Sequence, residues 1–466
     1  MKEGHTIMKK AELVIVGGGS AGFGAAYRAL KNGSCRVTLI EKNPGLGGTS
    51  TYGGVNCWEP GVGGNGIHKE LAARLEKAGQ GFVGEYTGQV SDARPWGWSV
   101  RSESPYEETL IRGDRTGEQQ RRFLFEPKAM EECMLSILRE TDTDGRLALL
   151  FNSEVCGVET ENGRITALKV RTPEGETEIC PEIVIDCTAE LCIARAAGCE
   201  VTAGEDASSK YNEPHAPDTP QCLINGLSQV FRIAKTEDGY IEPIPAEYNG
   251  PEIEKWVEEL ESGHYPLSCF NDYPNGDINV NMLPTINGAA WLEMPREELM
   301  RLCRGRVYAY FNWLGRTRGF TGYKIFSVFP MPGIRESYRL VGKYVLTEND
   351  LFNGYAAALG EGHSIAFADH PADLHGRTNK SGGMTTFRKY GIPYECLLPK
   401  ETENLLVACR GASFSHIAAS SARLSRTMIA LGEAAGIAAA ECLRSGITPT
   451  GVNPEVIRNI MGITEP

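Results

Sequence analysis

The stretch ELVIVGGGSAGFGAAYRALKNGSCRVTLIE, residues 12–41, decides the fold class of this chain. A β-branched run over residues 12–16 predicts a buried strand, and a similar run over residues 36–40 predicts a second one. Between them, alanine and leucine recur at helical spacing and Gly33 supplies a stop, which predicts an amphipathic helix. A strand, a helix and a strand within about 30 residues form a β-α-β unit, so we expect an α/β fold with a parallel sheet.

The glycine turn between the predicted strand and helix has the spacing G-x-G-x-x-G at Gly17, Gly19 and Gly22. Gly17 permits the tight turn, Gly19 lets the backbone approach a pyrophosphate, and Gly22 lets the helix pack closely on the strand. The unpaired N–H groups of the helix N-terminus attract the same anion. Glu41 ends the second strand, where an acidic side chain accepts hydrogen bonds from an adenosine ribose. The spacing therefore predicts a bound dinucleotide without a 2′-phosphate.

The composition of the 466 residues argues against several other classes of protein. Acidic residues outnumber basic ones by 60 to 47, and the basic residues form no long run, so we expect no nucleic-acid partner. No stretch reaches the roughly 20 apolar residues of a membrane helix, and the first residues do not resemble a signal peptide. The fourteen cysteines are scattered through apolar contexts, which favours a reducing compartment. We expect a cytoplasmic protein without a membrane partner.

A change in composition along the chain suggests two domains. Residues 1–205 and 392–466 carry the strand and helix patterns, including an amphipathic helix that starts at Pro127 and a long helix over residues 421–444. Residues 206–391 are richer in proline, asparagine and aromatic residues, and the alternation of strands and helices fades there. We predict a discontinuous dinucleotide-binding domain of Rossmann type, with an α+β substrate or cap domain inserted between its two parts.

Later segments resemble the flavoprotein version of the dinucleotide motif. They are a second glycine pair at 45–49, a strand and turn at 184–189, a late strand at 403–411 with a helix at 431–436, and a signature at 334–342. With them the chain resembles FAD-dependent oxidoreductases of the glutathione reductase type, in the broad group that also contains the fumarate reductase and succinate dehydrogenase flavoproteins. The closest resemblance is to bacterial FAD-dependent oxidoreductases of undefined substrate.

The resemblance implies non-covalently bound FAD and a set of residues that contact it. The expected cofactor-binding residues are Gly17, Gly19, Gly22, Glu41, Gly47, Gly48, Thr49, Thr188, Gly432, Ala435 and Gly436. It also implies hydride transfer between a carbon of a small polar metabolite and N5 of the flavin, with the protein supplying orientation and proton management. No motif specifies the substrate, the electron acceptor or the oligomeric state.

Two clusters of basic residues are candidates for catalysis. Arg410, His416 and Arg423 lie between the last predicted strand and the helix expected at the flavin. A histidine flanked by arginines suits proton exchange beside an anionic or polar substrate, which Arg423 would orient. In the alternative interpretation, the arginines stabilise the fold, and His416 is a polar residue whose hydrogen bonds are all made within the protein. Arg335 belongs to the second cluster, where an ion pair within the cluster favours a structural role.

Other interpretations of these residues remain open. An NAD-dependent dehydrogenase uses the same fingerprint, although the C-terminal segment would then lack a purpose, and a flavin-binding scaffold or sensor would lack turnover. The chain has no C-x-x-C, which argues against a disulfide relay through Cys57. His363, His370 and His375 match no zinc spacing, so we expect no metal site. His68 among glycines is weak support for a covalent flavin.

Overall fold

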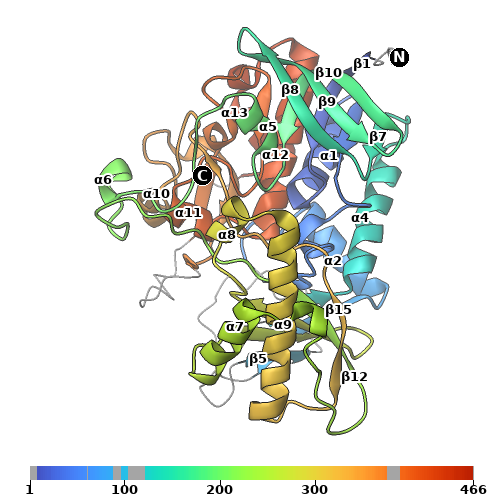
Figure 1. Ribbon diagram of the computed structural model, residues 1–466. Helices are drawn as coiled ribbons and strands as arrows, with labels where there is room; N and C mark the ends of the chain where they lie inside the picture. Colours follow the sequence, from blue (N-terminus) through green and yellow to red (C-terminus); the bar gives the residue numbers. More distant parts are fainter. Residues whose placement is uncertain (1–7, 60, 88–95, 103–120, 375–388, 465–466) are drawn as a thin grey trace, which may run out of the picture.

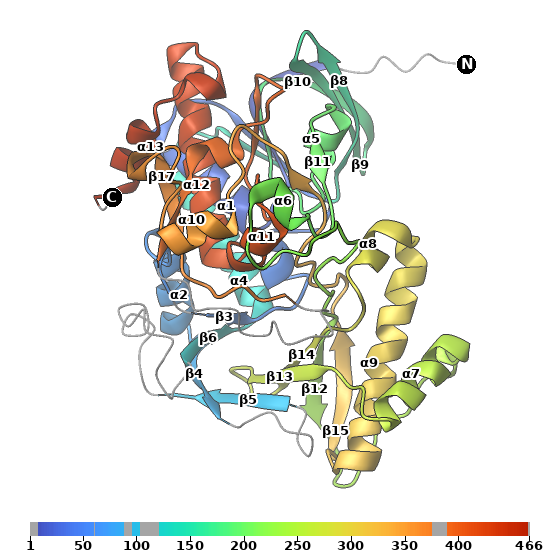
Figure 2. The same cartoon turned by 90° about the vertical axis from the view of Figure 1, so that its left-hand side faces the viewer.

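The computed structural model describes residues 8–59, 61–87, 96–102, 121–374 and 389–464 of the chain. Figure 1 shows two lobes. The first lobe contains helices α1 (Ser20–Asn32) and α12 (Ser425–Ser445), and the second contains α7 (Pro251–Glu261) and α9 (Arg296–Arg318). Figure 2, turned by 90°, shows that the second lobe also holds the strands β12 to β15, beside α9.

The first lobe is built on a seven-stranded sheet. Its strands are β1 (Met8–Val16), β2 (Val37–Ile40), β7 (Leu147–Leu150), β8 (Glu154–Glu161), β9 (Arg164–Thr172), β10 (Gly175–Asp186) and β19 (Leu405–Val407). The order is β7-β2-β1-β10-β9-β8, with β19 paired to the end of β10. Strands β7, β2, β1, β10 and β19 are parallel, whereas β10, β9 and β8 are antiparallel to one another in turn. The carboxyl ends of the parallel strands therefore meet at one edge of the sheet.

Local sequence patterns account for these elements. The helix α1 begins directly after the glycine turn and ends at Gly33, whose N–H donates to the carbonyl of Ala29, so the predicted β-α-β unit is confirmed. The helix α4 (Pro127–Thr141) begins at proline, as predicted. Asn162 and Gly163 join β8 to β9 with φ values of 48° and 76°, the positive values that a tight hairpin turn requires. The α/β class predicted from residues 12–41 is confirmed.

The long helix predicted over residues 421–444 is present as α12, which starts at Ser425, four residues later than expected. A separate short helix, α11 (His416–Ser421), precedes it. Leu424 separates the two helices, because its φ of -69° is helical but its extended ψ of 153° does not continue a helix.

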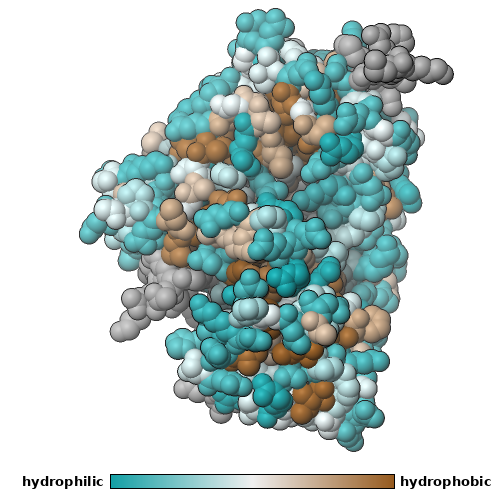
Figure 3. Space-filling view, in the orientation of Figure 1, coloured by the Kyte–Doolittle hydropathy of each residue, from teal (hydrophilic) through white to brown (hydrophobic). Residues whose placement is uncertain are grey.

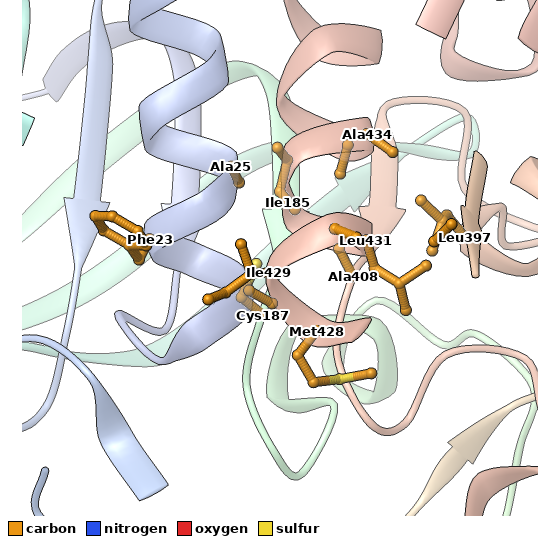
Figure 4. Close-up of a cluster of buried hydrophobic side chains, with 14 of the residues drawn as sticks. Phe23, Ala25, Ile185, Cys187, Leu397, Ala408, Met428, Ile429, Leu431 and Ala434 are labelled. Carbon is orange, nitrogen blue, oxygen red and sulfur yellow. The ribbon is translucent and has the colours of Figure 1, made fainter. Parts of the chain in front are cut away.

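The helices α1 and α12 cross in the first lobe at a distance that only glycine allows. A Cβ atom added to Gly432 would lie 1.9 Å from the carbonyl oxygen of Ala21, and one added to Gly436 would lie 2.3 Å from that of Ala25. Figure 4 shows the buried side chains gathered around this crossing and the neighbouring end of β10. The Ala- and Gly-rich composition of α12 thus permits close packing of two helix backbones.

The second lobe is built on an eight-stranded sheet. In sheet order its strands are β15 (Tyr323–Val328), β12 (Val230–Lys235), β14 (Ile278–Leu283), β13 (Leu267–Asp272), β5 (Trp96–Arg101), β4 (Gly81–Thr87), β6 (Arg121–Phe125) and β3 (Cys57–Trp58). All neighbouring pairs are antiparallel except β13 and β5. The helices α7, α8 (Ala289–Glu293) and α9 contribute apolar side chains to the core of this lobe, together with Phe231 and Phe270 of the sheet.

The sheet of the second lobe differs from the domain division predicted at residue 205. Its strands β3 to β6 come from residues 57–125, and its other four strands come from residues 230–328. Residues 346–374 and 389–391, which composition assigned to the inserted domain, contribute side chains to the core of the first lobe. There β17 (Ser364–Ala368) and β18 (Tyr390–Pro393) pair with each other, and β17 packs on α12. Composition reflects how many turn and surface residues a segment contains. The pairing of strands from distant segments decides which lobe each segment belongs to.

The remaining elements are short. They are α2 (Ile67–Lys77), α5 (Cys192–Ala196), α6 (Ser208–Tyr211), α10 (Glu348–Asn353), α13 (Pro454–Met461), β11 (Val201–Thr202), β16 (Arg339–Leu340), and the single turns η1 (Gly48–Ser50), η2 (Ala246–Tyr248), η3 (Glu361–His363), η4 (Tyr394–Leu397) and η5 (Pro449–Gly451). On the face shown in Figure 3, hydrophobic residues form separate groups among hydrophilic ones. Within the described ranges, no helix has the length and apolar character needed to cross a bilayer.

Candidate functional site

A cavity of about 450 Å³ is lined by both lobes. Its wall contains residues at the carboxyl ends of β1, β2 and β10 in the first lobe and residues of β13 and β14 in the second. The volume is typical of a small-molecule site. Because open parallel sheets bind ligands at the carboxyl ends of their strands, this cavity is the candidate functional site.

The glycine turn lies at one end of the cavity and has the geometry that its spacing predicts. Gly17 has a φ of 99°, and a Cβ atom there would lie 2.8 Å from the carbonyl oxygen of Cys187. A Cβ atom on Gly22 would lie 1.8 Å from the carbonyl oxygen of Gly17, so Gly22 serves helix packing. Gly19 lines the cavity, and a Cβ atom there would meet nothing within 4 Å. Open space therefore lies beside the N-terminus of α1, which fits the pyrophosphate of a dinucleotide.

Glu41 lies at the end of β2 and lines the same part of the cavity. It is only 5% exposed, and its Oε2 accepts a hydrogen bond of 2.6 Å from the N–H of Gly18. Its Oε1 accepts from the N–H of Asn43 over 2.8 Å. Oε1 also accepts from the side-chain amide of Asn43 over 2.6 Å, which occupies both of its lone pairs, whereas Oε2 keeps a second lone pair for a ribose hydroxyl. The position of Glu41 fits the ribose role that the sequence predicts.

The second glycine pair packs on the first. The N–H of Gly47 donates to the carbonyl of Gly18 over 2.8 Å, and Gly47 has a φ of 101°. Gly48 and Thr49 line the cavity, and the side chain of Thr49 accepts a hydrogen bond of 2.6 Å from Arg410. The described wall includes Gly48 and Thr49 but not Gly47, which therefore shapes the turn.

Thr188 follows β10 and also lines the cavity. Its hydroxyl donates to Asp186 over 2.6 Å, and its N–H donates to the same oxygen over 2.9 Å. The other oxygen of Asp186 accepts from the N–H groups of Ile193 and Ala194 at the start of α5. Burial raises the pKa of Asp186, although these hydrogen bonds oppose the shift. The turn that carries Thr188 is thus held at the cavity wall by a buried carboxyl group.

The structure places Gly432, Ala435 and Gly436 away from the cavity wall, contrary to the expected contact with the flavin. Gly432 and Gly436 lie at the crossing with α1, and all three residues are buried within α12. The part of this segment that lines the cavity is the start of α12, over residues 424–428. The N-terminus of α12 therefore meets the cavity, whereas the glycines in its middle serve the packing against α1.

Arg335 lines the cavity from the segment that follows the second sheet. Its guanidinium donates to the carbonyl of Gly226 over 2.9 Å and to the hydroxyl of Ser228 over 2.7 Å, and both acceptors are uncharged. Burial lowers the pKa of Arg335 to about 9, and the positive charge of Arg423 lowers it further. This guanidinium therefore carries its charge in a poorly solvated position.

Arg410 and Arg423 reach the same cavity from either side of α11. Arg410 donates to Thr49, and burial together with the charge of Arg423 lowers its pKa to about 10. Arg423 forms an ion pair of 2.6 Å with Asp373, which also lines the cavity. The structure thus brings together three of the four predicted catalytic residues, Arg335, Arg410 and Arg423.

The fourth residue, His416, is not in the described cavity wall, contrary to its expected contact with the substrate. It is 1% exposed, and its Nδ1 lies 2.9 Å from Oε1 of Glu336. Glu336 also pairs with Arg339, which pairs with Asp206 over 2.9 Å. Burial alone would raise the pKa of Glu336, but the charges of His416 and Arg339 hold it below its ordinary value. The helix α11 directs His416 into this buried ionic cluster, where its Nδ1 is paired but its buried Nε2 has no hydrogen-bond partner among the described residues.

The sequence analysis missed a polar strip on the second sheet. Cys269 and Asn271 of β13 lie opposite Asn281 and Asn279 of β14, and Cys269, Asn271 and Asn281 line the cavity. The Oδ1 atoms of Asn271 and Asn281 have no hydrogen-bond partner among the described residues. The alternation Asn279-Val280-Asn281, polar and apolar by turns, was the signal in the sequence, because it gives a strand one polar face.

The structure also describes three other candidates from the sequence, Cys57, His68 and His370. Burial raises the pKa of Cys57 to about 12, so this thiol of the cavity wall stays protonated at neutral pH. Burial and the charge of Arg426 lower the pKa of His68 to about 3, and its ring stacks on Trp58 at 4.2 Å. His370 lines the cavity with its Nε2 at 3.4 Å from Glu59, whereas His375 lies outside the described residues.

A sequence profile of the family described as FAD dependent oxidoreductase matches residues 12–461, which is nearly the whole chain. The match includes the glycine turn, Glu41, the cavity wall and both lobes. No curated protein matches this chain.

Solved structures with the same broad arrangement differ widely in sequence. A geranylgeranyl bacteriochlorophyll reductase-like protein from Thermoplasma acidophilum is 14% identical with a TM-score of 0.48, over 98% of this chain and 83% of that one. The L-proline dehydrogenase from P. horikoshii is 14% identical with a TM-score of 0.36, over 98% of this chain and 99% of that one. The myxobacterial chondrochloren halogenase is 10% identical with a TM-score of 0.44, over 95% and 77%. The assignment of this chain to a family therefore rests on the sequence profile alone.

Proposed function

The chain belongs to the family of FAD-dependent oxidoreductases, and from this premise we propose that it transfers a hydride between a carbon of a small polar metabolite and N5 of the flavin. It is an enzyme, and FAD is its cofactor. The observation that carries the proposal is a single cavity that reaches from the glycine turn to Arg335, Arg410 and Arg423. A dinucleotide along this cavity would leave its reactive ring and a polar substrate in the same enclosed space.

The residues at the first end of the cavity fit FAD. Gly19 leaves open space for the pyrophosphate at the N-terminus of α1, and Glu41 offers acceptors to the ribose. Thr49 and Thr188 line the path between the two lobes, and the start of α12 offers further N–H groups. When bound, FAD supplies the two-electron redox chemistry that no side chain can supply.

Residues at the second end would orient the substrate and move its proton. Arg335 and Arg423 offer guanidinium donors in fixed positions, because each is held by contacts with its own neighbours. His370 takes the role first expected of His416, since it lies at the cavity wall. Its Nδ1 donates to the carbonyl of Pro371 over 2.6 Å, which leaves Nε2, 3.4 Å from Oε2 of Glu59, as the nitrogen that accepts a proton. Residues of the second sheet form part of the cavity wall at this end.

Two measurements on the purified protein test the proposal. Its visible spectrum should show bound flavin, and chromatography of the heat-released cofactor should identify FAD. Anaerobic addition of alcohols, amines and hydroxy or amino acids should bleach the flavin with at least one of them. Recovery of NAD alone, or bound FAD that no compound reduces while dithionite does, would overturn the proposal.

A further inference from the structure

The charges at the second end of the cavity are not balanced within the described part of the chain. Arg335 and Arg410 contact only uncharged acceptors, which are Gly226, Ser228 and Thr49. Of the three arginines, only Arg423 forms an ion pair, with Asp373. Two guanidinium charges therefore face the cavity without an ion-pair partner among the described residues.

This arrangement is costly unless an anion completes it. Burial lowers the pKa of Arg335 and of Arg410, and both are lowered again by the positive charge of Arg423. Arg410 has lost hydration without gaining an ion-pair partner, and the charge of Asp373, which already pairs with Arg423, only partly offsets the burial of Arg335. A carboxylate that accepts hydrogen bonds from a planar guanidinium supplies both the charge and the acceptors.

The polar strip of the second sheet adds a requirement for a hydrogen-bonding group. Asn271 and Asn281 lie on the same face of β13 and β14 and line the cavity. Their Oδ1 atoms are buried and lack partners among the described residues. An amide oxygen in this state accepts an O–H or N–H group, and leaving it unpaired costs stability.

We infer that the substrate is a small carboxylic acid with a hydroxyl or amino group on the carbon that is oxidised. Arg335 and Arg410 bind its carboxylate, and Asn271 and Asn281 accept from its O–H or N–H group. This inference rests on the proposed function and deepens it by naming the substrate class. In the oxidation direction, the C–H bond breaks and its hydrogen leaves with the electron pair to reduce FAD at N5. The proton of the O–H or N–H group passes to Nε2 of His370, and a C=O or C=N bond forms.

Binding can be measured apart from turnover. The FAD-loaded protein is titrated with matched sets of acid, amide and deoxy compound, such as lactate, lactamide and propionate. Sets of two to six carbons include 2-hydroxy and 2-amino acids, and the readout is the shift of the flavin absorbance band. For at least one set, the acid should bind at least tenfold more tightly than its amide, as loss of one charged hydrogen-bond partner implies. The deoxy acid should also bind more weakly. If no acid binds more tightly than its amide, the inference is wrong.

Variants separate the substrate role from a cofactor role. Arg335→Met and Arg410→Met should keep FAD and lose the preference for acid over amide, whereas Asn281→Leu should lose the preference over the deoxy compound. Arg335→Lys should restore part of the acid preference. The control is Arg316→Met on α9, where the arginine is exposed and pairs with Glu261. FAD-loaded arginine variants that keep the full acid preference would overturn the inference.

The inference and the proposed function can fail separately. A holoprotein that discriminates acids from amides but is never reduced by them would support the binding inference and overturn the redox proposal. Reduction at equal rates by an acid and its amide would support the redox proposal and overturn the inference.

Discussion

The carboxylate of Glu41 accepts a hydrogen bond of 2.6 Å from the backbone N–H of Gly18, which lies 23 positions earlier in the chain. The acidic residue at the end of β2 is thereby tied to the glycine turn after β1. The second glycine pair joins the same unit, because the N–H of Gly47 donates to the carbonyl of Gly18. Three segments that the sequence connects only by spacing thus form one wall of the cavity.

Substitution of Glu41 should weaken FAD binding. Glu41→Gln replaces one acceptor oxygen by a donor, and loss of a charged hydrogen-bond partner costs about 1.5–3 kcal/mol, or roughly 10- to 150-fold in Kd. Fluorescence titration of the apoprotein with FAD measures this change. Glu12→Gln on β1, outside the cavity wall, is the control. An unchanged Kd in folded Glu41→Gln protein would show that the carboxylate does not face the ribose.

Two glycines of the same turn should respond differently to alanine. Gly19→Ala should fold normally, since its methyl group meets no atom within 4 Å, but should bind FAD at least about tenfold more weakly because the methyl group occupies the approach to the pyrophosphate. Gly22→Ala should lower thermal stability, because its Cβ would lie 1.8 Å from the carbonyl oxygen of Gly17. Thermal melts and FAD titrations of both variants check the contrast, and equal loss of stability would contradict it.

Alanine at the crossing of α1 and α12 should destabilise the protein without touching the cavity. Gly432→Ala and Gly436→Ala push Cβ atoms to within 2.3 Å of backbone oxygens of α1, and overpacking of this kind costs about 1–3 kcal/mol. The melting temperature should fall in both variants, with FAD affinity of the folded protein retained. Gly362→Ala, where the new methyl group has open space, is the control. Loss of FAD affinity at an unchanged melting temperature would instead support the flavin contact that the sequence predicts.

His416 should affect stability more than catalysis. His416→Ala removes a buried partner of Glu336 at 2.9 Å and should cost roughly 1–3 kcal/mol of stability. The folded, FAD-loaded variant should be reduced by substrate within about tenfold of the wild-type rate, because removal of a true general acid or base slows reactions by roughly 10² to 10⁴. Stopped-flow flavin reduction compares it with His370→Ala, which should be slow. If flavin reduction is slow in His416→Ala and its melting temperature is unchanged, His416 is the proton-transfer residue after all.

His68 should contribute to acid destabilisation. The pKa of His68 falls from 6.5 to about 3 on folding, mainly through burial, so between these pH values the unfolded chain binds a proton that the folded protein excludes. Stability from this group is therefore complete above about pH 6.5 and decreases as pH falls, by about 1.4 kcal/mol per unit. His68→Phe keeps a ring against Trp58 but cannot titrate.

Melting temperatures of wild type and His68→Phe between pH 7 and pH 4 measure this effect. As pH falls, the melting temperature of the wild type should decrease more than that of His68→Phe. Parallel curves would show that His68 is protonated or exposed in the folded protein.

The sequence by itself determined the parts of this protein that depend on local geometry. The unit over residues 12–41, the helix start at Pro127 and the hairpin turn at Asn162 all follow from side-chain periodicity, a fixed proline φ or the positive φ that a turn requires. The positions of Gly17 and Glu41 also follow from the sequence, because the standard dimensions of a strand, a turn and a helix fix where these two residues lie. Arg335, Arg410 and Arg423 were found by their positions beside these elements.

Only the tertiary structure decided which distant segments meet. Strands of residues 57–125 and 230–328 form one sheet through backbone hydrogen bonds that any sequence offers, so composition does not reveal the pairing. The packing of α11 and α12 placed His416 with Glu336 and Gly432 against Ala21. Successive side chains on a helix differ in direction by about 100°. Sequence spacing therefore indicates which residues lie near a site, whereas the packing of the helix decides which of them face it.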